Sequence, residues 1–259
     1  MISPNSSVDK SAKLGKNVTV SPFAVIYGNV EIGEGTWIGP HVTIMEGARI
    51  GKNCRIFPGA VISAIPQDLK FSGEESTVQI GDNTTIREFV TINRGTKDRM
   101  TTAVGSNCLL MAYVHVAHDC LVGNHVILAN SVNLAGHITI ADHAILEGLV
   151  AVQQFVNIGA HSFVTGGSLV RKNVPPYVKA AREPLSYIGV NSVELRRRGF
   201  SNEAVLQIED IYRTIYVRGH NVSNALNIVE QEAPASAEKE LIVKFIRDSK
   251  DGIIRGITA

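Results

Sequence analysis

The sequence has few cysteines and aromatic residues, almost no net charge and no long apolar run. Its three cysteines, Cys54, Cys108 and Cys120, lack CxxC or zinc-type spacing, so we expect reduced core residues. A net charge of +1 argues against general affinity for nucleic acid. No apolar run approaches the ~20 residues that span a bilayer, and the first residues lack the pattern of a secretory signal. We therefore expect a cytoplasmic protein with no stable membrane anchor.

Aliphatic residues recur at every sixth position through most of the chain. A period of six does not match the 3.6-residue period of a helix, and it is typical of short strands joined by tight corners. The series comprises Leu14, Val20, Ile26, Ile32, Ile38, Ile44, Ile50, Ile56 and Ile62, then Ile80, Ile86 and Ile92, and then every sixth residue from Val104 to Val170.

Small residues and turn formers flank each aliphatic position. A small or β-branched residue such as Ala24 or Val30 stands two places before it, and Gly, Asn or Asp cluster just after it. Three strands of six residues make a coil of 18, and successive coils stack about 4.8 Å apart. The pattern therefore predicts a mainly β, three-sided solenoid over residues 1–185.

The repeats stop after residues 174–177, and a helical pattern follows. Ser201 and Ser236 are suited to capping two helices. Their expected apolar faces are Val205, Ile208, Ile211, Tyr212, Ile215 and Tyr216 in the first, and Leu241, Ile242, Phe245 and Ile246 in the second. We therefore expect a small helical domain over residues 186–259.

The six-residue period breaks twice, at about residues 63–77 and 93–101. The first break holds 12 residues more than the period allows, and the second holds 6 more. If these extra residues form loops, both loops leave from the same edge of the prism, and insertions in a solenoid usually mark its binding side. On that edge we expect His118, Gly136 and Gln154 to stack in one column.

His118 is the candidate catalytic base on this edge, because Asp119 follows it and Gly136 lies beside it. An imidazole accepts a hydroxyl proton near neutral pH, and a carboxylate can orient the ring. The Gly136 amide is placed to donate to a thioester oxyanion. Other histidines are expected to be structural or solvated, namely His125, His143 and His161.

The repeat resembles that of the hexapeptide-repeat acyltransferases, which implies a left-handed parallel β-helix and a homotrimer. More specific motifs are residues 111–120 (MAYVHVAHDC), 86–88, 90–96, 134–137 and 189–191. They resemble the UDP-N-acetylglucosamine O-acyltransferases of lipid A biosynthesis over essentially the whole chain. The resemblance implies transfer of a 3-hydroxyacyl chain from acyl carrier protein to the 3-hydroxyl of UDP-N-acetylglucosamine, without a cofactor.

The resemblance also implies roles for individual residues. His118 is the base, Asp119 its partner and Gly136 the oxyanion donor. The substrate-contact positions are Asp68, Lys70, His115, His137, Gln154, Asn191 and Arg198. Arg197 and Arg198 belong to a basic run suited to a diphosphate or an acidic carrier protein. Taken alone, Lys70, His137 and this run are equally compatible with solvated or structural side chains.

Several positions depart from the family or are expected to set acyl-chain length. Gln153 and Asn93 stand where the family often has His. Gly166 matches a position where a bulkier residue shortens the accepted chain, and Pro184 matches a second position at the end of the groove. We therefore expect a long acyl chain.

Four alternatives remain open. A zinc site built from His115, His118 and His137 would resemble gamma-class carbonic anhydrases, although we expect no metal. A sugar N-acyltransferase would need an N-terminal uridine-binding domain, and the repeats begin near residue 12. An acyltransferase dependent on coenzyme A would not need the basic run, and a non-catalytic scaffold would not need the two loops.

Overall fold

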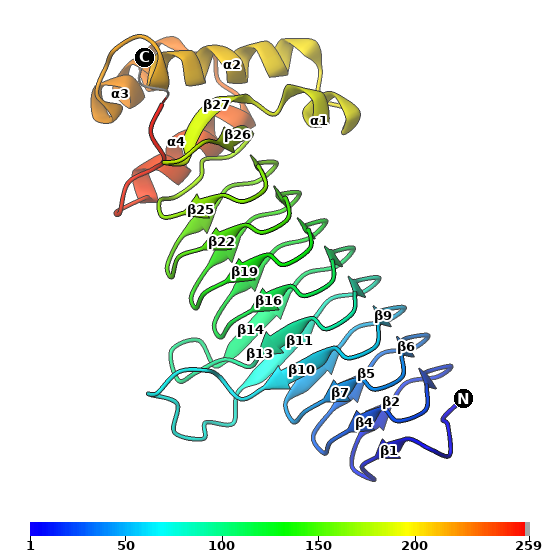
Figure 1. Cartoon of the computed structure of the whole chain (residues 1–259). Coiled ribbons are helices and arrows are strands. Elements are labelled where there is room, and N and C mark those ends of the chain that lie inside the picture. The colour runs from blue at the N-terminus through cyan, green and yellow to red at the C-terminus, as the bar shows by residue number, and fades with distance from the viewer. Residues whose placement is uncertain (257–259) are drawn as a thin grey trace.

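The protein is a three-sided, left-handed parallel β-helix with helices at its C-terminal end (Figure 1). The structure is a computed structural model, and it describes residues 1–256. Three strands form each coil, and each side of the prism is one sheet. The predicted fold class is confirmed.

Each sheet is listed from the N-terminal end. The first sheet comprises β1 (Ser7–Val8), β4 (Val25–Ile26), β7 (Thr43–Ile44), β10 (Val61–Ala64), β13 (Thr91–Asn93), β16 (His115–Val116), β19 (Asn133–Leu134), β22 (Ala151–Val152) and β25 (Leu169–Val170). The second comprises β2 (Lys13–Leu14), β5 (Glu31–Ile32), β8 (Ala48–Ile50), β11 (Thr77–Ile80), β14 (Thr101–Val104), β17 (Leu121–Val122), β20 (Thr139–Ile140) and β23 (Asn157–Ile158). The third comprises β3 (Thr19–Val20), β6 (Trp37–Ile38), β9 (Arg55–Ile56), β12 (Thr85–Ile86), β15 (Leu109–Leu110), β18 (Ile127–Leu128), β21 (Ile145–Leu146), β24 (Phe163–Val164), β26 (Val178–Ala181) and β27 (Ser186–Val190).

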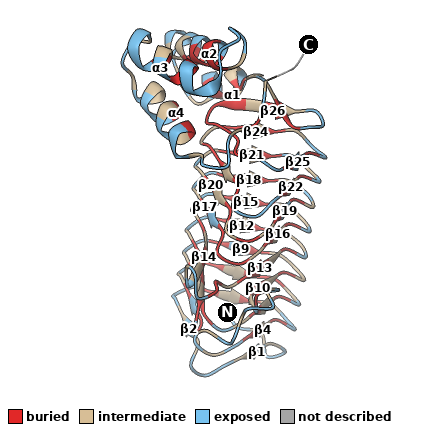
Figure 2. Ribbon diagram, turned by 90° about the vertical axis from the view of Figure 1, so that its left-hand side faces the viewer, coloured by how far each residue is buried: buried red, intermediate tan, exposed pale blue. Residues whose placement is uncertain are grey.

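The core is a stack of aliphatic side chains inside the coils. Ile26 pairs in register with Ile44, 18 residues later, and both side chains are buried (Figure 2). Burying a side chain of this size stabilises the fold by about 1.5–3 kcal/mol. The three cysteines are free and buried in the same stack, as predicted. The coils begin earlier than residue 12, because Val8 continues the six-residue series and pairs with Ile26.

The three corners of the prism differ in chemistry. The site corner comprises the turns that follow first-sheet strands, and it carries both loops. The polar corner comprises the turns that follow second-sheet strands; there, side chains such as Asp142 accept hydrogen bonds from the next turn, with Asn124 N donating at 2.7 Å. The apolar corner comprises the turns that follow third-sheet strands, and its exposed side chains are Phe23, Phe89, Tyr113 and Leu149.

The chain leaves the solenoid through an antiparallel pair, β26 and β27, and continues into α1 (Ser192–Arg197), α2 (Asn202–Tyr216), α3 (Val222–Glu232) and α4 (Ala237–Asp248). Ser201 and Ser236 cap α2 and α4, as predicted, by accepting from backbone amides. Helices α1 and α3 were not predicted. No helix within residues 1–256 is long and apolar enough to cross a membrane.

Most of the predicted helix faces are buried, but one residue is not. Ile242 and Ile246 of α4 pack inward, whereas Leu241 is 39% exposed. Successive helix residues point about 100° apart, so Leu241 lies at the margin of the face that Ile242 occupies. The expectation that Leu241 faces inward was therefore wrong.

Candidate active site

Both insertions leave the prism at the site corner. Loop 1 (residues 65–76) follows β10, and loop 2 (residues 94–100) follows the next first-sheet strand, β13. The coil beginning at Ile62 is 30 residues long, since Ile62 pairs with Ile92, and the next is 24 long, since Ile92 pairs with Val116. These lengths match the predicted extras of 12 and 6 over a coil of 18, so the shared edge is confirmed.

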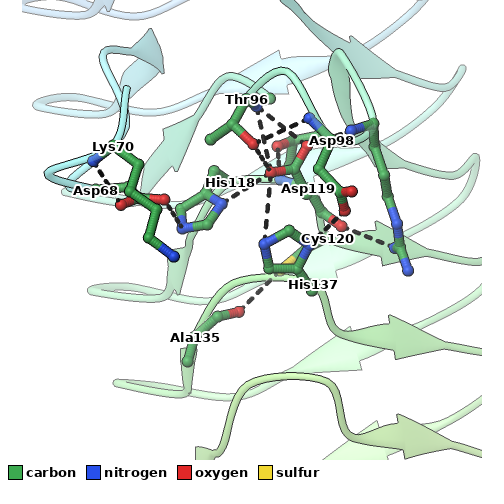
Figure 3. Close-up of polar contacts among 12 residues, drawn as sticks. Asp68, Lys70, Thr96, Asp98, His118, Asp119, Cys120, Ala135 and His137 are labelled. Carbon is green, nitrogen blue, oxygen red and sulfur yellow. Dashed lines mark hydrogen bonds and ion pairs between the residues drawn. The ribbon is translucent and has the colours of Figure 1, made fainter. Parts of the chain in front are cut away.

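His118 and Asp119 form a buried pair beside these loops (Figure 3). The His118 Nδ1 atom lies 2.9 Å from Asp119 Oδ2. His118 is 5% exposed and Asp119 is fully buried. Because an ionised carboxylate accepts only, Asp119 fixes the proton of the neutral ring on Nδ1 and leaves the Nε2 lone pair free.

Loop 2 surrounds the Asp119 carboxylate with donors. Thr96 donates through its amide at 3.1 and 3.2 Å and through its hydroxyl at 2.7 Å, and the Arg99 amide donates at 3.1 Å. Burial raises the pKa of Asp119, but these bonds and the bond to His118 together hold it below its usual value. Asp119 is therefore an anion at neutral pH.

The sequence analysis assigned no role to Thr96 or Arg99. Loop 2 was recognised as an insertion, but its length did not show that it folds back onto Asp119. The Arg99 guanidinium also donates to the Asp119 backbone carbonyl at 2.8 Å, and Thr102 Oγ1 accepts from the Asp119 amide at 2.8 Å. A short polar insertion next to a buried carboxylate was the available signal.

Gly136 lies directly against the imidazole ring. A Cβ built on Gly136 would lie 2.5 Å from Cε1 and 2.7 Å from Nε2 of His118, closer than real Cβ contacts occur. Any side chain at this position would therefore displace the ring. His118, Gly136 and Gln154 occupy equivalent positions on successive coils, as the column prediction required.

Loop 1 brings a carboxylate to the other face of His118. Asp68 Oδ2 lies 3.9 Å from His118 Nε2, and Asp68 Oδ1 accepts from the Lys70 amide at 2.9 Å. The Lys70 side chain is exposed. A pocket of about 250 Å³ lies between the two loops, lined by Asp68, Lys70, Glu74, Thr96, Lys97, Asp98, His137 and Phe155.

His137 stands one coil beyond His118 and contacts the same network. The two rings meet edge to face with centroids 5.1 Å apart, and His137 stacks on Phe155 at 4.7 Å. His137 Nδ1 is 3.0 Å from Asp98 Oδ2, but the two groups are not aligned as a hydrogen bond. His137 therefore has a nitrogen available for another partner.

The remaining residues expected at this edge lie around the pair. His115 Nδ1 is 2.7 Å from Thr91 Oγ1; burial lowers the pKa of His115, and the nearby His118 lowers it further. Gln154 is exposed two coils beyond His118.

The zinc alternative finds only part of its ligand set. His118, Asp119 and His137 offer atoms within 4.8 Å of one another, and His115 does not belong to this group. The Asp119 carboxylate already accepts from Thr96 and Arg99. Hydrogen bonds thus account for this arrangement without a metal.

Four predicted residues lie elsewhere on the protomer. Asn191 and Arg198 lie at the polar corner, where Asn191 Nδ2 donates to the His161 carbonyl at 3.0 Å and Arg198 donates to the His143 carbonyl at 3.0 Å. Arg197 is exposed and pairs with Glu194 at 2.6 Å. Gly166 is at the apolar corner, where its amide donates to Glu147 at 3.0 Å. One protomer therefore does not bring these four residues to His118.

Comparison with known proteins matches this architecture. Residues 29–64 and 101–136 match the model described as "Bacterial transferase hexapeptide (six repeats)". Residues 173–257 match "Udp N-acetylglucosamine O-acyltransferase; Domain 2".

Full-length relatives are also similar. The acyl-[acyl-carrier-protein]–UDP-N-acetylglucosamine O-acyltransferase of Sulfurihydrogenibium sp. is 47% identical, covering 97% of this chain and 93% of the relative. The protein of the same name from Halorhodospira halophila is 46% identical, covering 98% and 99%. A solved UDP-N-acetylglucosamine acyltransferase from Bacteroides fragilis superposes with a TM-score of 0.97 at 53% identity, covering 98% of this chain and 100% of that one. The chain belongs to the acyl-[acyl-carrier-protein]–UDP-N-acetylglucosamine O-acyltransferase family.

Proposed function

We propose that this protein transfers a 3-hydroxyacyl chain from acyl carrier protein to the 3-hydroxyl of UDP-N-acetylglucosamine, the first step of lipid A biosynthesis. The observation that carries the proposal is the 2.9 Å bond between His118 Nδ1 and Asp119 Oδ2. It leaves His118 Nε2 as a base on the side where loop 1 lies. The relatives named above carry this activity in their names.

The chemistry follows from the pair. His118 Nε2 takes the proton of the sugar 3-hydroxyl as its oxygen attacks the thioester carbonyl. The Gly136 amide stabilises the oxyanion that forms. When the carbon–sulfur bond breaks, His118 returns the proton to the departing thiolate, and Asp119 stabilises the imidazolium in between.

The substrate contacts follow from the placement of the loops. Asp68 and Lys70 of loop 1 bind the sugar nucleotide, with His115, His137 and Gln154 completing the sugar side. Asn191, Arg197 and Arg198 bind the nucleotide and its diphosphate. No metal and no cofactor takes part in this proposal.

We propose a homotrimer as the active form. Three features support it: the exposed apolar side chains Phe23, Phe89, Tyr113 and Leu149, the buried His118, and the separation of Arg198 from His118 within one protomer. Residues on different corners can act on one substrate only across an interface between protomers. We place the reaction in the cytoplasm, where the carrier protein and the nucleotide sugar would both be available.

We propose a long acyl chain as the donor. Gly166 is exposed and carries no side chain, so nothing at this position shortens a groove along the apolar corner. A panel of carrier proteins loaded with 10- to 16-carbon hydroxyacyl chains tests this. A preference for 10 carbons contradicts it.

The function itself is tested by incubating the purified protein with 3-hydroxyacyl carrier protein and UDP-N-acetylglucosamine. We expect a 3-O-acylated sugar nucleotide, identified by mass spectrometry and by its lability to mild base. Reaction only with acyl-coenzyme A, or only with a 3-amino sugar, would contradict the proposal. A crystal soaked with UDP-N-acetylglucosamine should place the sugar beside His118.

A further inference from the structure

Both ends of α1 are tied to one histidine of the solenoid. Asn191, the residue that precedes the helix, donates from Nδ2 to the His161 carbonyl at 3.0 Å. Arg198, the residue that follows the helix, lies with NH1 3.1 Å from His161 Nδ1. By resemblance these two residues are the nucleotide contacts, so His161 is placed to fix both.

The contact to Arg198 requires one form of the imidazole. A guanidinium only donates hydrogen bonds, so His161 Nδ1 must accept, and the ring must be neutral with its proton on Nε2. Burial lowers the pKa of His161 to about 4, with His143 and Arg198 acting in the same direction and Asp142 opposing. The ring is therefore neutral at pH 7.

A column of rings holds this imidazole in place. His161 stacks on His143 at 4.7 Å and on Tyr177 at 5.6 Å, and Phe200 meets its edge at 5.2 Å. The titratable or charged groups facing it are His143, Arg198, Asp142 and Tyr177. Because neighbours on both sides fix the ring plane, Nδ1 points at Arg198 without reorganisation.

We propose that His161 is a positioning residue for nucleotide binding, whose neutral imidazole accepts from Arg198 and holds the guanidinium ready for the diphosphate of the substrate. This inference rests on the proposed function, because the nucleotide role of Arg198 belongs to it. A merely structural histidine would contribute stacking alone. Acceptance through Nδ1 and stacking can be separated by substitution.

Two variants separate the two contributions. His161→Phe keeps an aromatic ring but removes the acceptor, and His161→Asn keeps an acceptor near Nδ1 but removes the ring. His161 has a φ of 58°, and Asn and Phe occupy the equivalent corner conformation elsewhere, as at Asn107 and Phe89. His125→Phe is the matched control, since His125 lies in the same column, stacked on His143 at 4.6 Å.

For His161→Phe we expect the KM for UDP-N-acetylglucosamine to rise about tenfold, with kcat within about threefold of the parent. His161→Asn should return KM to within about threefold, and His125→Phe should leave both constants unchanged. Arg198→Ala should raise KM, and His161→Phe should add nothing in that background, because the two act through one contact. In the parent at pH 7, nitrogen NMR should show His161 protonated on Nε2 alone.

The outcomes distinguish this inference from the function on which it rests. If Arg198→Ala raises KM but His161→Phe does not, the positioning role is wrong while the function stands. A His161 ring protonated on Nδ1 at pH 7 also overturns it, without depending on any variant folding. If Arg198→Ala leaves KM unchanged, the assignment of Arg198 and this inference both fall. If the parent transfers no acyl group to the sugar nucleotide, the proposed function itself is wrong.

Discussion

Two corners of the prism carry histidines, and they use them in opposite ways. At the site corner, His118 has a carboxylate on Nδ1 and a second carboxylate 3.9 Å from Nε2. At the polar corner, His143 and His161 stack on each other at 4.7 Å, and burial lowers the pKa of both. A carboxylate partner stabilises the imidazolium, whereas stacked neighbours and a guanidinium oppose it. The partners of each ring, more than its solvent exposure, therefore decide which can act as a base.

The largest expected effect tests the site corner directly. His118→Ala should lower kcat by about 10²–10⁴-fold, since it removes a general base. The matched change at the polar corner, His125→Ala, should leave kcat within about threefold of the parent. Steady-state acyl transfer measures both. Equal losses in the two variants would remove the distinction between the corners.

The second test concerns the packing of the ring. Gly136→Ala should lower kcat about 10- to 100-fold, because the new Cβ would lie 2.5 Å from His118 Cε1 and push the ring off its partner. Gly28 occupies the equivalent position at the N-terminal end of the site corner, where a Cβ would meet a rotatable serine hydroxyl at 2.9 Å. Gly28→Ala is therefore the control. A full-rate Gly136→Ala variant would contradict the proposed packing.

A smaller effect tests the role of loop 2. Thr96→Ala should lower kcat about tenfold, because the Asp119 carboxylate loses the hydroxyl donor at 2.7 Å while keeping the backbone amide of Thr96. Thr96→Ser restores a hydroxyl and should recover most of the rate. If Ser and Ala behave alike, the hydroxyl does not orient Asp119.

The smallest expected effect concerns stability at the polar corner. The pKa of His161 is about 4 in the fold, against an ordinary value of 6.5, so the unfolded chain binds more protons between these values. Stability is therefore complete above pH 6.5 and is lost as pH falls toward 4. The ring is only partly buried, so we expect the parent to lose about 2–4 °C of Tm more than His161→Asn over this interval. Equal pH profiles of Tm in the two proteins would contradict this.

Much of the solenoid could be predicted from the sequence. The aliphatic period placed the core residues, since every sixth side chain must point inward in a three-strand coil, and the two breaks placed both loops on one edge. The start of the coils was set too late, because Val8 was not counted in the series. Short helices such as α1 and α3 give too few turns for a clear pattern, and Leu241 shows that such a pattern leaves the margin of a face undetermined.

The candidate site was only partly predictable, for a similar reason. His118, Asp119 and Gly136 followed from the column and the motif, because stacking of coils is a local rule. The donors to Asp119 come from Thr96 and Arg99, about 20 residues earlier in the chain. No period relates a loop residue to a turn two strands later. Only the folded path of loop 2 brings them together.

The sequence by itself determined the period of six, hence the three-sided prism, its core and the edge on which both insertions lie. The tertiary structure alone decided how those insertions fold back, which donors hold Asp119 as an anion, and that both ends of α1 meet His161. The physical reason is range. A repeat is set by contacts between adjacent coils, whereas the electrostatics of a buried side chain depend on every group that the fold brings near it.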